Sequence, residues 1–305
     1  MNIQSILALT DLSAPSRRAV ARAGLIAAEH RALLKILYAA PALGRCADSD
    51  AAARTSALAQ EIAARFGILV KCIPHAPGSG HLADVRAAAR RVDLLVVDAD
   101  CERGSPAGFG GSPVTRLLRA VACPVLVTQR EALHRYRRLL VAVDFTPASQ
   151  RMVGLAWALD GTAEVELFHA LSGAPEGRLR LADASEQALK ASRHQRLGEA
   201  RERMFWLSDS APPAPERRVV SAIGQGDPAR QAAVQQQARG AELLVVGKRQ
   251  RHGPLAALAD FLLGSVAQRV LGMATADVLV VPYATRTQPE AADARLGTGM
   301  KAVPR

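Results

Sequence analysis

The stretch Glu242-Leu-Leu-Val-Val-Gly247 decides the fold of this chain, because it is a short apolar run without polar alternation. Such a run is typical of a strand that is buried on both faces of a parallel sheet. A basic loop follows, then Gly264-Ser265 at the start of an apolar helix, then the run Asp277-Val-Leu-Val-Val281. A strand that leads through a glycine-bearing loop to a helix N-terminus can hold phosphate on its free backbone amides.

The same arrangement occurs once more, earlier in the chain. Asp93-Leu-Leu-Val-Val-Asp98 precedes a glycine-rich loop, which ends at Gly111-Ser112 before another helix and the run Pro124-Val-Leu-Val127. Residues 111–128 and 264–281 share seven of 18 residues. Self-similarity of this kind indicates an internal duplication.

The beginning of each copy is also similar. Residues 6–20 and 139–153 share five of 15 residues, among them Asp11 and Asp144 directly after the first apolar run. Both copies alternate short apolar runs with helical patterns, which predicts an α/β fold with a doubly wound, five-stranded parallel sheet in each of two tandem domains. The predicted organisation is domain 1 at residues 1–129, a linker at 130–137, domain 2 at 138–283 and a disordered tail at 284–305.

The predicted elements follow from the period of the apolar residues. Strands are expected at residues 6–10, 33–38, 69–74, 92–97 and 125–128, and again at 139–143, 165–170, 218–223, 243–246 and 278–281. Helices are expected at residues 16–30, 51–66, 81–91 and 113–121, and again at 147–158, 184–207, 228–239 and 265–272.

Composition limits the class of protein. No apolar stretch reaches the roughly 18 residues of a membrane span, and no basic segment followed by an apolar run marks a signal peptide at the start. The four cysteines lack zinc-ligand or CxxC spacing, so we expect reduced thiols. The net charge of +11 suggests nucleic acid, but the arginines are scattered and no basic–aromatic alternation accompanies them, so nucleic-acid binding is not favoured.

Together, these residues resemble the universal stress protein family in its tandem form. The resemblance rests on an Asp-x-[Ser/Thr] after the first strand, a late glycine signature ending in Gly-Ser, and a closing Val-Leu-Val-Val strand. It covers nearly all of residues 1–283. It implies a cytoplasmic stress-response protein that binds ATP, with or without Mg²⁺. It also implies that the two domains pair their last strands as an intrachain pseudo-dimer, with residues 125–128 facing 278–281. A homodimer and an unidentified protein partner are also compatible with the family.

In the second copy the resemblance assigns an adenine-nucleotide site to Asp144 and Thr146 at the strand end, to Gly247, and to Gly264 and Ser265. The charges of Lys248 and Arg249, at the start of the basic loop, could neutralise a triphosphate and add these residues to the predicted site. The signature departs from the family pattern, because Gln250 stands where a second glycine belongs and the segment before Gly264 is longer. From the residues alone, Asp144 could contact ribose, adenine or Mg²⁺, or it could cap the helix that starts near Pro147.

The first copy lacks the features that favour phosphate. Asp98 and Cys101 replace the two leading glycines, and Asp100 and Glu102 add negative charge nearby. Carboxylates repel phosphate, so we expect the first copy to have lost triphosphate binding and Asp11 to serve mainly as a helix cap.

Two other functions remain open at this stage. The chain could be a nucleotide-free scaffold that acts through protein contacts, or a weak ATP hydrolase; no P-loop, metal cluster or evident general base supports an enzyme. Gly224-Gln-Gly226-Asp-Pro-Ala229 imitates a dinucleotide fingerprint, but it follows the third strand of its copy rather than the first. His169 is interpreted as a satisfied core or rim histidine.

Overall fold

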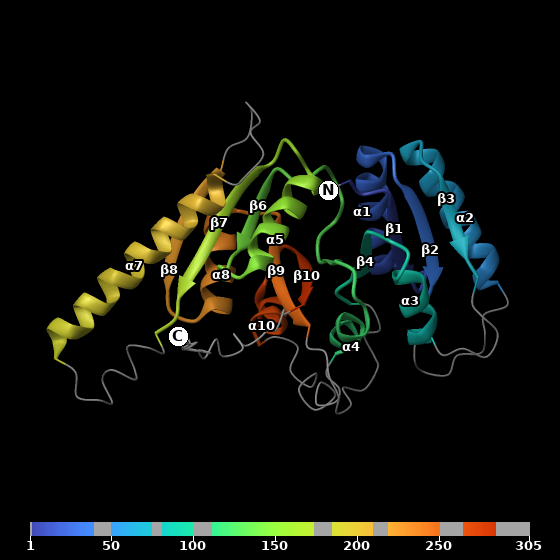
Figure 1. Cartoon of the computed structure of the whole chain (residues 1–305). Coiled ribbons are helices and arrows are strands. Elements are labelled where there is room, and N and C mark those ends of the chain that lie inside the picture. The colour runs from blue at the N-terminus through green and yellow to red at the C-terminus, as the bar shows by residue number, and fades with distance from the viewer. Residues whose placement is uncertain are drawn as a thin grey trace, which may run out of the picture.

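Ten strands form one continuous sheet in the computed structural model, with helices on both of its faces (Figure 1). The structure describes residues 2–39, 50–74, 81–100, 112–173, 185–209, 219–250 and 265–284. The strands are β1 (Ser5–Thr10), β2 (Leu33–Tyr38), β3 (Val70–Ile73), β4 (Leu94–Asp98), β5 (Val125–Thr128), β6 (Arg138–Ala142), β7 (Glu164–Leu171), β8 (Val219–Gln225), β9 (Leu243–Gln250) and β10 (Asp277–Ala284). The helices are α1 (Ala14–His30), α2 (Ala51–Phe66), α3 (His81–Ala89), α4 (Pro113–Ala120), α5 (Pro147–Leu159), α7 (Glu186–Asp209), α8 (Pro228–Arg239) and α10 (Ser265–Met273).

The order of the strands makes the duplication visible. Across the sheet it is β3-β2-β1-β4-β5-β10-β9-β6-β7-β8, so each half contributes five adjacent strands in the same internal order. Within each half the described strands pair in parallel. The halves meet where β5 and β10 pair antiparallel, with Leu126 opposite Leu279. The expected pairing of the last strands is confirmed, and it joins the two expected sheets into one.

The continuous apolar runs are buried on both faces, as their lack of alternation predicted. In β1, Ile6 and Ala8 belong to one core, whereas Leu7 and Leu9 belong to the other. Helices α1, α2, α5 and α7 supply buried side chains to the first core, and α3, α4, α8 and α10 supply them to the second. This two-sided covering is the doubly wound α/β architecture.

Two strands are longer than the sequence pattern indicated. β9 continues to Gln250 and β10 to Ala284, and their ends pair in register, with Val281 opposite Gly247 and Pro282 opposite Lys248. Residues 248–250 therefore lie in a strand, and the expectation that the basic loop starts at Lys248 is wrong. The reason is that β9 and β10 pair with each other, and this pairing continues past the apolar run of each strand.

A buried carboxylate holds the segment that connects the halves. Asp277, at the start of β10, accepts hydrogen bonds from the backbone N–H groups of Gln129 and Arg130 at 2.8 and 3.0 Å. Its other oxygen accepts the Tyr136 hydroxyl at 2.6 Å and lies 3.3 Å from Nε of Arg22, which comes from α1. Burial and the charge of Asp277 raise the pKa of Tyr136 well above its usual value. One acidic side chain thus ties the first half, the connection and the second half together.

The basic residues of the connecting segment are also engaged. Nε of Arg130 donates to the Thr275 carbonyl at 2.6 Å, and Arg135 pairs with Glu29 at 3.2 Å. Arg138 donates to the Arg239 carbonyl at 2.9 Å. These three arginines, which lie close together in the sequence, therefore have separate partners. The predicted tail, apart from Ala284 at the end of β10, lies outside the described residues.

Candidate functional site

Each half of the sheet has a point at which the strand order reverses. In the second half, β7 lies on one side of β6 and β9 lies on the other. Open α/β sheets bind ligands beyond the carboxyl ends of the strands at such a point. Asp144 follows the end of β6, and Gly247 lies in β9 beyond the last residue that pairs with β6, Val245. The two residues therefore lie on either side of this switch point, which we call the crevice of the second half.

Asp144 is an exposed carboxylate that organises the turn into α5. Its Oδ1 accepts hydrogen bonds from the backbone N–H and the hydroxyl of Thr146, at 3.1 and 2.6 Å, and from the Ser149 hydroxyl at 3.2 Å. Thr146 occupies the N-cap position but makes no side-chain capping bond, because its hydroxyl is directed to Asp144. Asp144 is therefore not the cap, and its carboxylate is held at the crevice.

The first half has the same turn with a different cap. Ser13 is the N-cap of α1, and its hydroxyl accepts from the Ser16 backbone N–H. Asp11 accepts from the Ser13 backbone N–H at 2.9 Å, so the expectation that Asp11 caps the helix is wrong. Burial opposes ionisation of Asp11, but hydrogen bonds from Ser13 and Ser16 outweigh it and lower its pKa.

A strained residue follows each of these aspartates. Leu12 and Phe145 have φ angles of 65° and 60°, in the left-handed region that side chains other than Gly, Asn and Asp rarely adopt. This conformation turns the chain sharply between the strand and the helix. The ring of Phe145 lies against that of His169 at this turn, and strained backbone is common at ligand sites.

Tyr283 forms the wall between Asp144 and Gly247. Its hydroxyl donates to Oδ2 of Asp144 at 3.2 Å, from the extended end of β10. A Cβ atom on Gly247 would lie 3.0 Å from Cε1 of Tyr283 and 3.0 Å from Sδ of Met152. Glycine at this position therefore has a packing reason, besides any close approach of a ligand. The sequence analysis missed Tyr283 because it ended the last strand at Val281.

Phe145 and His169 form an aromatic shelf at the carboxyl ends of β6 and β7. Their ring centroids are 4.2 Å apart with an interplanar angle of 35°, and Nδ1 of His169 is 2.8 Å from the Val143 carbonyl oxygen. The guanidinium of Arg203 lies 5.8 Å from the centroid of the Phe145 ring. A flat apolar surface with a cation beside it suits stacking of a base.

Burial lowers the pKa of His169 below its ordinary value of 6.5, with the nearby arginines acting in the same direction and the bond to the Val143 carbonyl opposing. The unfolded chain therefore takes up a proton at a higher pH than the folded chain. We expect the folded state to lose stability as the pH falls from about 6.5 through the lowered pKa, and this loss to shrink in His169→Gln. Urea unfolding of both proteins against pH measures the difference, and an NMR titration giving His169 a pKa above 6.5 would contradict it.

Lys248 is not positioned as the sequence analysis expected. Its side chain is 6% exposed, and Nζ donates to the carbonyl of Leu118 in α4, which belongs to the first half. The ammonium therefore stabilises the joint between the halves, and Lys248 is not among the cations that a ligand in the crevice would meet. The extension of β9 explains the difference, because it places Lys248 in a strand, from which its side chain reaches α4, rather than in a loop.

In the first half, a buried carboxylate takes the place of Gly247. Asp98 pairs with Thr128 in the register in which Gly247 pairs with Val281, so the two positions correspond. Asp98 is 2% exposed, and burial raises its pKa. Its Oδ1 accepts the backbone N–H of Asp100 at 2.8 Å. The first half therefore has an acidic side chain where the second half has none.

Part of the predicted site lies outside the described residues. Gly264 and the 251–257 segment are among these, as is the corresponding Gly111 of the first half. Ser265 begins α10 and Arg249 lies in β9, but their side chains are likewise outside the description. Within the described part of the chain, no group of three or more His, Cys, Asp and Glu side chains could hold a metal ion. No described helix is long and apolar enough to cross a membrane.

The fold and the crevice define a tandem α/β protein whose two halves share one sheet. Residues 135–282 match the universal stress protein family, and this second half of the chain belongs to that family. The match begins just before β6 and ends within β10, so it covers the half that contains Asp144 and Gly247.

Solved structures share the fold over almost the whole chain. A universal stress protein from Archaeoglobus fulgidus DSM 4304 covers 91% of this chain and 98% of its own, with a TM-score of 0.63 and 19% identity. A functionally unknown protein from Pseudomonas aeruginosa PAO1 covers 92% of both chains, with a TM-score of 0.62 and 22% identity. No curated protein matches the chain. Because these structures cover both halves of the chain, they share its tandem arrangement of two α/β units.

Proposed function

We propose that this protein binds an adenine nucleotide, with ATP as the preferred ligand, in the crevice of its second half, and that it acts in a stress response through the bound state. The observation that carries the proposal is the exposed carboxylate of Asp144. Thr146, Ser149 and Tyr283 hold it at the point where the strand order reverses. An oriented, accessible acceptor at this place suits the hydroxyl groups of a ribose.

The charges around the crevice orient the ligand. The negative charge of Asp144 repels a triphosphate, so the ribose and the base belong at this end. The Phe145–His169 shelf lies beside it and offers a stacking surface for adenine. The phosphates then extend toward Gly264 and Ser265, where the N-terminus of α10 favours anions. A bound nucleotide would bring phosphate groups that Arg249 is suited to neutralise; Lys248 has no part in this arrangement.

Our proposal leaves the first half without a triphosphate. Asp98 stands at the position of Gly247 in its strand, and its carboxylate would repel a phosphate bound there. The first half nevertheless has the same turn, at Asp11. In our proposal this turn supports the fold in both halves and contacts a ligand only in the second half.

A titration of the full chain with ATP tests the proposal, with Gly264→Val as the test variant and Gly111→Val as its matched control. A branched side chain at residue 264 would block approach to the helix N-terminus, so we expect Gly264→Val to weaken binding about tenfold or more, equivalent to about 1.4 kcal/mol. Gly111→Val should leave the affinity unchanged. Equal losses in both variants would mean that the competent half is wrongly assigned.

A nucleotide-free scaffold is the second candidate function, and two observations favour it. Gly247 is explained by its packing against Tyr283 and Met152, and Lys248 is committed to the joint between the halves. Two residues of the predicted site thus have structural roles that need no ligand. Absence of ATP binding by the wild-type chain, together with purified protein free of adenine nucleotide, would establish this alternative.

A further inference from the structure

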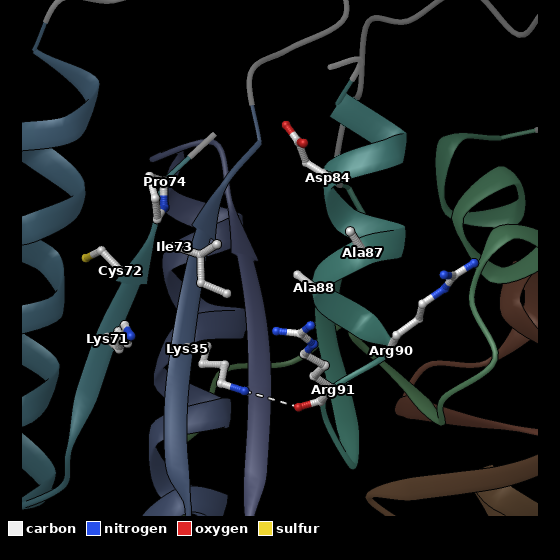
Figure 2. A pocket seen from close by; sticks show the side chains of 10 residues that line it. All are labelled: Lys35, Lys71, Cys72, Ile73, Pro74, Asp84, Ala87, Ala88, Arg90 and Arg91. Carbon is white, nitrogen blue, oxygen red and sulfur yellow. Dashed lines mark hydrogen bonds between the residues drawn. The ribbon is translucent and has the colours of Figure 1, made fainter. Parts of the chain in front are cut away.

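A groove lies under α3 on the first half, away from both crevices. Strands β2 and β3 form its floor and α3 its wall, and it encloses a cavity of about 630 Å³ (Figure 2). A volume of this size is usual for sites that take small molecules. The middle of the groove is aliphatic, with Ile73 facing Ala88 across it, and none of the described residues that line it is aromatic.

One end of the groove is strongly basic. Lys35 and Lys71 are direct neighbours in the parallel register of β2 and β3, and Arg90 and Arg91 follow the end of α3. Nζ of Lys35 donates to the Arg91 carbonyl at 3.1 Å. Asp84 also lines the groove, but Figure 2 shows it at the opposite end from Lys35 and Arg91. In the described part of the chain, none of the four cations forms an ion pair.

The second half has an acidic residue at the position that corresponds to Lys35. Leu7 of β1 pairs with Lys35, and the corresponding Leu140 of β6 pairs with Glu166, so Lys35 and Glu166 occupy equivalent positions. Glu166 is 6% exposed, and its carboxylate accepts a hydrogen bond from one residue of α8 and forms an ion pair with another. Nε2 of Gln235 is 2.6 Å from its Oε1, and Nε of Arg239 is 3.1 Å from its Oε2.

The duplication therefore leaves a missing acid in the first half. Asp93, just before β4, corresponds to Glu242, just before β9. Arg90 and Arg239 each lie three residues before that acid, so they occupy equivalent positions. In the second half the arginine at this place is neutralised by Glu166. In the first half the acid is replaced by Lys35, and Lys71 adds a second like charge beside it, which is unfavourable without a counterion.

We propose that this groove binds a small carboxylate with an aliphatic body. The carboxylate of the ligand takes the role that Glu166 has in the second half, and it is held by Lys35, Lys71 and Arg91, whose side chain points toward Lys35 in Figure 2. The aliphatic body lies between Ile73 and Ala88, where its burial contributes about 25 cal/mol per Å². Neutralising the adjacent lysines makes the bound state more stable than the free one, so the ligand also raises the melting temperature.

Calorimetric titration of the full chain with sodium decanoate, below the concentration at which it forms micelles, tests this proposal. We expect one decanoate per chain, and binding about tenfold weaker or more in Lys71→Glu. Lys35→Glu restores the acid of the second half, so it should pair with Arg90, fold normally and lose binding. Lys190→Glu, which makes the same charge change at an exposed position of α7, should bind like the wild type.

Several results would overturn the proposal. They are the absence of decanoate binding by the wild type, equal binding by Lys35→Glu and the wild type, and equal binding of decanol, which has the aliphatic body without the charge. Displacement of decanoate by ATP would also overturn it, because it would place the ligand in the crevice of the second half. The groove and the nucleotide site can therefore fail or succeed independently.

Discussion

Asp277→Ala is expected to lower the free energy of unfolding by about 3–5 kcal/mol, the range for removing one partner of a buried ion pair. The side chains of Asp277 and Arg22 are 0% and 6% exposed, so the guanidinium would stay in the interior without its counterion. The Arg22 guanidinium also lies 4.3 Å from the centroid of the Tyr136 ring, which fixes its place. Chemical denaturation followed by circular dichroism measures the change.

Removing the carboxylate would also release the connection between the halves. The backbone amides of Gln129 and Arg130 and the Tyr136 hydroxyl would each lose their acceptor. A buried donor left without a partner costs about 1–3 kcal/mol. Asp277→Asn keeps the shape and an acceptor but not the charge, so its loss should fall between those of the wild type and the alanine variant.

Glu61→Ala is the matched control for Asp277→Ala. It breaks the Arg17–Glu61 pair, whose N–O distance is 2.7 Å but whose side chains are 50% and 54% exposed. A solvent-exposed pair of this kind contributes about 0–1 kcal/mol. Similar losses for the two alanine variants would show that the network around Asp277 does not hold the halves together.

Asp144→Ala is expected to weaken ATP binding about tenfold or more, because a hydrogen bond to a charged group contributes about 1.5–3 kcal/mol. The matched control is Asp11→Ala, which removes the equivalent carboxylate from the first half. Asp11→Ala should leave ATP affinity unchanged. Fluorescence or calorimetric titration of each full-length variant gives the two dissociation constants.

The turn around Asp144 requires a further variant, because the carboxylate also supports Thr146, Ser149 and Tyr283. Asp144→Asn retains an acceptor for the Thr146 backbone N–H, and with it the turn, while it removes the negative charge. We expect its affinity for ATP to lie between those of the wild type and Asp144→Ala. Wild-type affinity in Asp144→Ala would remove the residue from the site and with it the main support for a nucleotide in this crevice.

Most of the architecture could be read from local pattern. The apolar runs at residues 243–246 and 278–281 identified buried strands, and the repeat at Asp11 and Asp144 identified two copies of one unit. These features depend on the period of neighbouring residues and on glycine and aspartate at turns, which a short window of sequence contains. The place of Asp144 and Gly247 at one crevice followed from the rule for strand ends in open sheets.

The surroundings of individual side chains could not be read in this way. The sequence placed Lys248 in a phosphate loop, but pairing of β9 with β10 extended the strand and directed its ammonium to Leu118 in the other half. Tyr283 was missed for the same reason. The positions of Lys248 and Tyr283 depend on contacts between residues far apart in the chain. The local spacing of apolar residues does not predict how far a strand extends or which of its faces is covered.

The amino-acid sequence by itself determined two copies of an α/β unit, the parallel, doubly wound type of their sheets and the acidic residue that stands in the first copy where the second has Gly247. Only the tertiary structure decided that Asp277 would bind the connection and Arg22, and that Lys35 would stand where the second half has Glu166. Apolar periodicity is a local property and survives in the sequence, whereas the partner of a buried charge is chosen by whichever distant segments the shared sheet brings together.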